Sequence, residues 1–311
     1  MVALAPKVPV SLTAAGLGIL TTLGSCRHAH TQAAILGRCL ALRFPETPKA
    51  VVGNLSDISG LQHFGWSLLA SSDLRLRSGF ESKLCLNEHS PFAETLFLDS
   101  DILPVQCGVQ ALNEFLGPLR ACAAPVAYYA TRYQSGESFQ GTPIAPLQAR
   151  LGIGGIYGSH GGGHYYWRKG PPADAIFARA REIAAESWPE ILRFNEALSG
   201  AVRVPDEVVI AITLALQVPD AQLPSGDAVI RSYRFTPSSA ATFVHFLADY
   251  NPLLYYRMTT SILGERRAPA LASFWYLERI LRKGLMRLRR GGWTWHHVRR
   301  LVPLDQSGDS V

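Results

Sequence analysis

Residues 95–105 read TLFLDSDILPV, an apolar run that is interrupted at Asp99, Ser100 and Asp101 and resumes at Ile102. A short apolar run of this kind predicts a buried strand. A carboxylate is costly to bury unless it is paired, hydrogen-bonded or bound to a metal ion. Two carboxylates at the end of such a strand therefore predict a cation that both share. Such oxygen ligands suit Mg²⁺ or Mn²⁺, and the alternative is a solvated turn whose carboxylates cap a helix.

The rest of the chain alternates short apolar segments with helical ones, which predicts a mostly parallel α/β sheet flanked by helices. In such a sheet the two aspartates lie at the carboxyl end of a strand, where ligands bind. The strands are expected at residues 17–23, 49–53, 66–71, 94–101, 126–131, 161–169 and 241–246. The helices are expected at residues 31–43, 79–90, 106–117, 172–186, 206–216 and 269–290.

The compartment is predicted from three features of the chain. Residues 8–26, VPVSLTAAGLGILTTLGSC, read either as a signal peptide or as the first core strand. We favour the strand, because the α/β alternation would otherwise lack its first member. No stretch approaches the ~20 apolar residues of a membrane-spanning helix. The five cysteines are scattered without a paired motif, which favours a reducing compartment, so we expect a cytoplasmic protein.

The positive charge of the chain is concentrated near its C-terminus. The formal net charge is +6, yet residues 264–302 alone carry ten Lys or Arg against two acidic residues. The sequence therefore predicts a catalytic domain over residues 1–263 and a basic, amphipathic helical extension with a tail over residues 264–311. Either the extension packs on the domain with its arginines solvated, or it contacts anionic lipid at the inner membrane face. A nucleic-acid partner is not expected, because no recognition motif accompanies the charge.

A longer segment around the aspartates resembles a known family. ESKLCLNEHSPFAETLFLDSDILPV, residues 81–105, is similar to the core of the GT-A-fold glycosyltransferases, above all the glycogenin and bacterial galactosyltransferase-like group, family eight. Those proteins carry a lysine on a helix, then SPF-x-x-x-LFLDSD, and their two aspartates hold Mn²⁺ against a nucleotide-sugar diphosphate. A looser similarity over residues 19–53 covers the expected uridine pocket.

The resemblance implies a function and a first set of site residues. It implies a GT-A fold and a metal-dependent transfer of a sugar from a nucleotide-diphosphate donor, with UDP as the expected nucleotide. The acceptor would be a glycan or a lipid-linked sugar. Lys83, Asp99 and Ser100 would contact the donor, and Asp99 and Asp101 would hold Mn²⁺ or Mg²⁺.

The family also places a histidine late in the fold as the third metal ligand, and FVHFLADYNP offers His245. The alternative is a core histidine on an apolar strand. An imidazole beside two carboxylates favours Mn²⁺ over Mg²⁺. After this histidine the family has a Lys-Pro pair, whereas this chain has Asn251-Pro252, so Arg257 is the candidate for the missing positive charge.

Two further segments complete the predicted site. In SHGGGHYYWRKG, Gly162 and Gly163 would let a sugar or phosphate approach the backbone, or they form a plain turn. The family's asparagine is absent there, and His160 or His164 is the candidate to replace it.

In VPDEVVIAIT, Asp206 would bind sugar or acceptor hydroxyls, and Glu207 stands where the family has glutamine. Inverting relatives place a carboxylate base at a comparable helix start. The pair can equally be a helix-capping pair, so stereochemistry stays open. The missing Lys and Asn leave a second function open, a non-catalytic GT-A-like protein that binds nucleotide or carbohydrate.

Overall fold

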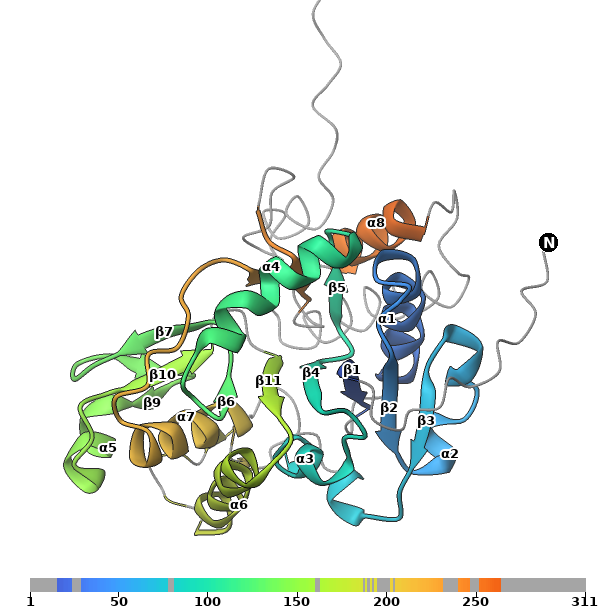
Figure 1. Ribbon diagram of the computed structural model, residues 1–311. Coiled ribbons are helices and arrows are strands. Elements are labelled where there is room, and N and C mark those ends of the chain that lie inside the picture. The colour runs from blue at the N-terminus through green and yellow to red at the C-terminus, as the bar shows by residue number, and fades with distance from the viewer. Residues whose placement is uncertain are drawn as a thin grey trace, which may run out of the picture. The chain divides into compact units, whose positions relative to one another are not determined.

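A six-stranded sheet forms the centre of the protein (Figure 1). The computed structural model describes residues 16–23, 29–77, 81–159, 163–186, 188, 191, 193–194, 202–203, 205–231, 240–246 and 252–263. Strands β3, β2, β1 and β4 lie parallel in that order, and β11 joins antiparallel between β4 and β6. These strands are β1 (Leu17–Thr22), β2 (Lys49–Gly53), β3 (Ser67–Ala70), β4 (Glu94–Leu98), β6 (Val126–Ala127) and β11 (His164–Arg168).

Helices connect these strands and cover the sheet (Figure 1). α1 contacts α8 and β5, while α6 and α7 pack together and both contact the 3₁₀ helix η3. The longer helices are α1 (Ala29–Arg43), α4 (Gly108–Ala121), α5 (Ile144–Leu151), α6 (Pro171–Glu186), α7 (Asp206–Gln217) and α8 (Pro252–Leu263). The short ones are α2 (Leu55–Ile58), η1 (Leu61–Phe64), η2 (Leu74–Arg77), η3 (Glu81–Cys85) and α3 (Leu86–His89).

The remaining strands form small sheets at the margins of the central one. A three-stranded sheet joins β14 (Val229–Arg231), β15 (Phe243–His245) and β5 (Ile102–Pro104). Three two-stranded pairs join β7 (Ala130–Tyr133) to β10 (Ile156–Ser159), β8 (Ser138–Phe139) to β9 (Thr142–Pro143), and β12 (Arg193–Phe194) to β13 (Val202–Arg203).

The central parallel strands are apolar because both of their faces are buried. β2 is buried at every position, and β1 and β4 are buried at all positions but the first. Parallel strands buried on both faces carry near-continuous apolar runs instead of alternating patterns. The predicted mostly parallel α/β sheet is therefore confirmed, and its first strand lies where residues 17–23 predicted it.

Two predicted elements differ in the structure. The helix expected over residues 79–90 is divided into η3 and α3, because the Cys85 backbone, with φ −119° and ψ 6°, leaves the helical region. The strand expected over residues 126–131 is divided into β6 and β7. Between them Tyr129 N–H donates to His164 Nε2 at 3.0 Å instead of to a strand partner. The predicted helix over residues 269–290 lies outside the described residues.

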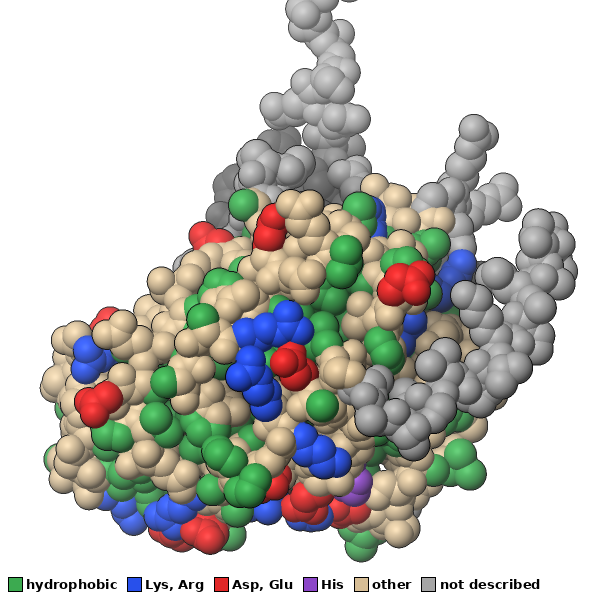
Figure 2. All heavy atoms as spheres, in the orientation of Figure 1, with side chains coloured by type: hydrophobic (Ala, Val, Ile, Leu, Met, Phe, Trp, Pro, Cys, Tyr) green, Lys and Arg blue, Asp and Glu red, His purple; other side chains and the backbone are tan. Residues whose placement is uncertain are grey.

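The hydropathy of the helices and the charge on one face of the protein bear on its surroundings. In the part of the chain that the structure describes, no helix combines the length and apolar character needed to cross a membrane. On the face that Figure 2 shows, basic side chains lie beside acidic ones among the coloured residues, so no large area of a single charge is visible there.

Candidate active site

The two aspartates follow β4 directly, at the carboxyl edge of the central sheet. Asp99 N–H donates to the Gly163 carbonyl at 2.8 Å, which ties the end of β4 to the start of β11. Ile102 N–H donates to the Asp99 carbonyl at 3.0 Å and closes a tight turn around Ser100. The turn leaves both carboxylates partly accessible, with 19% of the Asp99 side chain and 16% of the Asp101 side chain exposed.

His245 reaches this turn because β5 pairs with β15. The register places Ile102 opposite His245, and Phe246 N–H donates to the Asp101 carbonyl at 2.9 Å. The His245 Nε2 atom lies 3.1 Å from Asp101 Oδ1 and 4.0 Å from Asp99 Oδ2. One ligand atom from each of the three residues lies within 4.8 Å of the others. The structure thus brings together the two aspartates and the histidine that the sequence singled out.

Lys83 lies on η3 and connects this cluster to a second pair of carboxylates. Its Nζ donates to Asp99 Oδ2 at 2.9 Å and lies 3.6 Å from Asp206 Oδ2. Burial alone would lower the pKa of Lys83, but the nearby carboxylates of Asp206 and Asp99 outweigh it and raise this pKa above its usual value. Lys83 is therefore a fixed cation between the two carboxylate groups.

Asp206 and Glu207 begin α7 and are almost fully buried, with exposures of 1% and 8%. The Tyr165 hydroxyl donates to Asp206 Oδ2 at 2.7 Å, and Gly163 N–H donates to Glu207 Oε1 at 3.1 Å. Gln140 Nε2 donates to Glu207 Oε2. The helix begins after Pro205 without a side-chain cap, and both carboxylates bond to other elements of the fold.

Burial raises the pKa of both acids above the usual range. Lys83 opposes the rise at Asp206, while at Glu207 the neighbouring Asp206 adds to it. A carboxylate whose pKa is raised is a stronger base, which suits a group that takes part in proton transfer.

Gly163 links the two carboxylate groups and has room for no side chain. Its φ is +68°, and a Cβ atom there would lie 2.7 Å from Asp99 Oδ2 and 3.0 Å from His245 Cε1. Its backbone carbonyl and N–H bond to Asp99 and Glu207 respectively. The glycine is needed both for its backbone conformation and for the close approach of the cluster.

The other predicted residues divide into three outcomes. The Ser100 hydroxyl donates to Gln32 Oε1 of α1 at 3.5 Å, so it lies against that helix. His164 is a fully buried core residue whose Nε2 accepts from a backbone N–H, so it does not replace the family's asparagine. Gly162, His160 and Asn251 lie outside the described residues. Arg257 lies on α8, and its side chain is also outside the described part.

Sequence reasoning missed two residues of the site, Tyr165 and Gln140. Tyr165 lies on β11, a strand that was predicted, two residues after Gly163. Its hydroxyl–carboxylate contact depends on the position of α7. Gln140 lies in a loop with no predicted element.

A second cluster of potential ligands consists of Asp73, Cys85 and His89, which also lie within 4.8 Å of one another. Hydrogen bonds from Arg75 to both Asp73 oxygens hold the pKa of that carboxyl far below its usual value. Burial raises the pKa of the Cys85 thiol to about 11. The Asp73 carboxylate is already paired with the Arg75 guanidinium, and the Cys85 thiol keeps its proton. The cluster is therefore an ion-pair network and not a metal site.

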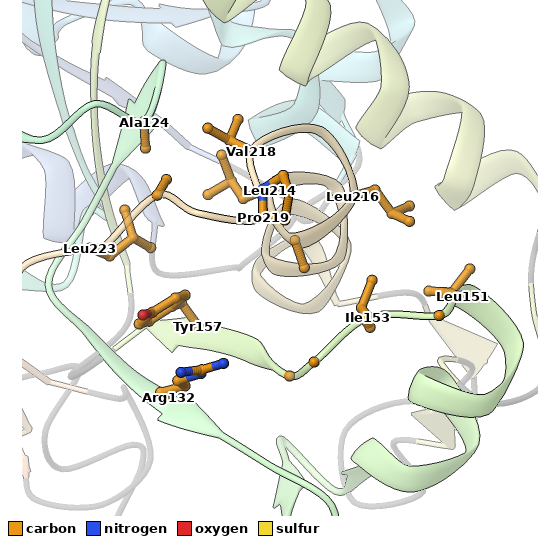
Figure 3. A pocket seen from close by; sticks show the side chains of 15 residues that line it. Ala124, Arg132, Leu151, Ile153, Tyr157, Leu214, Leu216, Val218, Pro219 and Leu223 are labelled. Atoms are coloured by element: carbon orange, nitrogen blue, oxygen red, sulfur yellow. The ribbon is translucent and has the colours of Figure 1, made fainter.

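The other end of α7 borders a cavity of about 270 Å³ (Figure 3). Leu214, Leu216 and Val218 line one side, and Arg132 and Tyr157 of the β7–β10 pair line another. The Arg132 guanidinium lies 5.9 Å from the Tyr157 ring centroid. Because Asp206 and Leu216 stand near opposite ends of α7, this cavity is distinct from the carboxylate cluster.

No family model matches the chain. A search of curated proteins also found no match. Among solved structures, the apo form of WbbM, a bifunctional glycosyltransferase, is similar with a TM-score of 0.51 at 11% identity, over 89% of this chain and 53% of that one. The fold is that of the GT-A glycosyltransferases. The fold predicted from residues 81–105 is therefore confirmed.

Two further glycosyltransferase structures are similar to the chain with TM-scores below 0.5. The galactosyltransferase LgtC, in complex with donor and acceptor sugar analogs, has a TM-score of 0.49 at 10% identity, over 81% of this chain and 97% of that one. GlyE of Streptococcus pneumoniae has a TM-score of 0.47 at 11% identity, over 79% and 63%. At 11% identity the WbbM comparison establishes the fold alone, and the function has to be argued from the site.

Proposed function

We propose that the protein is a metal-dependent glycosyltransferase that moves a sugar from a nucleotide-diphosphate donor, with UDP as the nucleotide, to a glycan or lipid-linked acceptor. One observation carries the proposal. Asp99, Asp101 and His245 lie within reach of a single ion, at the sheet edge where ligands bind, beside a buried carboxylate pair. The GT-A fold supports the same conclusion.

The residues of the cluster fit a divalent ion. Two carboxylates and one imidazole form a donor set that suits Mn²⁺ better than Mg²⁺. The missing side chain at Gly163 keeps open the space beside Asp99 Oδ2 that a Cβ atom would fill. When bound, the ion would supply Lewis-acid stabilisation of the leaving diphosphate.

Lys83 has a separate role in this proposal. Its ammonium group stays charged and is held between Asp99 and Asp206, so it neutralises part of their charge before the donor arrives. A compact fixed cation at this position can also bind an oxygen of the donor. We assign it to donor binding, together with Gly163, whose backbone a sugar or phosphate can approach closely.

Asp206 and Glu207 divide binding and proton transfer between them. The Tyr165 hydroxyl and Lys83 orient Asp206, which we assign to sugar hydroxyls. Gly163 N–H donates to Glu207 and so orients its carboxylate. The raised pKa of Glu207 suits a base that removes the proton of the acceptor hydroxyl while that oxygen attacks the anomeric carbon. This assignment predicts inversion at the anomeric carbon, which NMR of the product tests directly.

A panel of nucleotide sugars tests the function. We expect one donor class to raise the melting temperature only when Mn²⁺ is present, and slow release of nucleotide from that donor with water as acceptor. Binding without hydrolysis or transfer would instead support the second candidate, a non-catalytic nucleotide-binding protein. Failure of every donor to bind with Mn²⁺ would refute the proposal.

Residues 264–311 lie outside the described part of the chain, and we propose that they bring the enzyme to anionic lipid. The support is their charge, since each Lys or Arg near an anionic surface contributes about 1 kcal/mol. Co-sedimentation of the full chain with anionic vesicles, and with zwitterionic vesicles as control, tests this at low and high salt. Binding that fades with salt supports the contact, and no binding at low salt refutes it.

A further inference from the structure

The first residue of a tight hairpin turn reaches the candidate active site. The register of β8 and β9 leaves Gln140 and Gly141 as a two-residue turn, with φ values of 49° and 74°. Among the described residues, Gln140 is the sole non-glycine residue with a positive φ. Turns with positive φ at both central positions prefer Asn-Gly, Asp-Gly or Gly-Gly. Glutamine is therefore an unfavourable choice for the turn itself.

The hairpin that carries this turn is anchored to the fold. Phe139, the residue before the turn, is buried and packs against β10, where a Cβ atom on Gly158 would lie 2.4 Å from its ring. The Phe139 ring also lies 5.1 Å from the Tyr133 ring, centroid to centroid. At the other end, Ile144 N–H donates to the Glu137 carbonyl at 3.0 Å. The turn is thus held in place although Gln140 itself is exposed.

The Gln140 side chain spans from this exposed turn to the buried Glu207 carboxylate. Its Nε2 donates to Glu207 Oε2, while Gly163 N–H donates to Oε1. Asparagine would suit the turn better, but its side chain is one methylene shorter. The contact with Glu207 therefore explains the choice of glutamine, because turn stability alone would favour a different residue. Backbone strain of this kind persists where the surrounding structure imposes it, often at functional sites.

We propose that Gln140 is a positioning residue for Glu207, and that it fixes the orientation in which this carboxylate meets the acceptor hydroxyl. The inference rests on the proposed function. With one amide donor on each oxygen, the Glu207 carboxylate cannot rotate freely about its terminal bond. Gln140 thereby connects an exposed turn to a buried carboxylate.

Gln140→Asn is the decisive variant, because the two explanations predict opposite results. If the residue served only the turn, asparagine would preserve or improve both stability and activity. If it positions Glu207, the variant keeps its melting temperature but loses about tenfold or more in kcat, as misplacement of a reacting group does. The KM for the donor should change little. Gln140→Met should also lose kcat, whereas the control Gln134→Met, an exposed glutamine just after β7, should not.

Activity is measured as nucleotide release from the sugar nucleotide that the Mn²⁺ panel identifies, first with water and then with simple saccharides as acceptors. Wild-type kcat in Gln140→Asn would overturn the assignment. A double-mutant cycle with Gln140→Met and Glu207→Gln in urea unfolding reports the contact without activity, and we expect non-additive effects. Additive effects overturn the Gln140 assignment alone. A wild-type protein that hydrolyses no sugar nucleotide refutes the proposed function, and the assigned role with it.

Discussion

Replacement of Gly163 by alanine should damage the proposed metal site more than the fold, and a second glycine provides the matched control. Gly152, which ends α5, has the same φ of +68°, and a Cβ atom there would meet nothing within 4 Å. Alanine in the left-handed region costs about 1–2 kcal/mol at either position. With a melting-temperature shift of about 2–4 °C per kcal/mol, both variants should melt a few degrees below wild type.

Only Gly163→Ala adds crowding at the cluster. Its Cβ atom would lie 2.7 Å from Asp99 Oδ2, whereas ordinary van der Waals contact begins at 3.4 Å, so the carboxylate has to move by about 0.7 Å. The same oxygen accepts from Lys83 Nζ at 2.9 Å, and that bond has to adjust as well. Changes that shift the orientation of a metal ligand typically reduce metal affinity by about 10–100-fold. We expect a loss of that size for Mn²⁺ in Gly163→Ala and none in Gly152→Ala.

Isothermal titration of Mn²⁺ in the presence of UDP measures the affinity, and urea unfolding measures the stability of the same samples. Equal Mn²⁺ affinity in the two glycine variants would show that Asp99 is not a ligand, or that the cluster tolerates the displacement. Either result would refute the reasoning from Gly163. A large excess loss of stability in Gly163→Ala over Gly152→Ala would assign the glycine to packing instead.

Three further predictions concern charges in the site. Asp101→Asn should abolish Mn²⁺-dependent UDP binding while the melting temperature stays near that of wild type; unchanged UDP affinity in calorimetry would contradict the metal site. Lys83→Met should destabilise the protein by about 3–5 kcal/mol at pH 7, because it leaves the carboxylates of Asp99 and Asp206 without their buried cation. Urea unfolding should show that most of this loss is recovered when Asp206→Asn is added.

For Glu207, the raised pKa fixes the sign of a pH effect. Below about pH 4, near the usual pKa of glutamate, Glu207 holds its proton in both the folded and the unfolded state. Above this pH the unfolded state releases the proton first. The contribution of Glu207 to the free energy of unfolding therefore falls as the pH rises. The stability of Glu207→Gln relative to wild type should therefore improve between pH 4 and pH 8 in urea unfolding, and a flat difference would contradict the raised pKa.

The central sheet could be predicted from the sequence because its strands are local signals. β1, β2 and β4 are short apolar runs between helical segments. Each begins at the first residue of its predicted range and ends at its predicted end or a few residues before it. Strand β5 was not predicted, because its three residues after Asp101 carry no periodicity. Its pairing with β15 joins segments far apart in the chain, and no local pattern encodes such a pairing.

The site shows the same division between local and non-local information. Asp99 and Asp101 could be predicted from the sequence because their carboxylates interrupt an apolar run. His245 was found only through the family resemblance, since an isolated histidine on a strand does not indicate its neighbours. Gln140 had a weak local signal, a Gln-Gly pair in a loop, but its meaning depends on a positive φ and on contact with Glu207. A residue such as Gln140 can be identified as part of the site only when the geometry of its turn is known.

The distribution of charge in the site supports the proposed divalent ion. Lys83 is shared by Asp99 and Asp206, and Glu207 has only neutral donors on its two oxygens, from Gly163 and Gln140. The site as described therefore holds more negative than positive charge, and burial together with mutual repulsion raises the pKa of Asp206 and Glu207. A divalent cation at the aspartates and His245 would supply the missing positive charge, and would favour the ionised form of Glu207 that the proposed proton transfer requires.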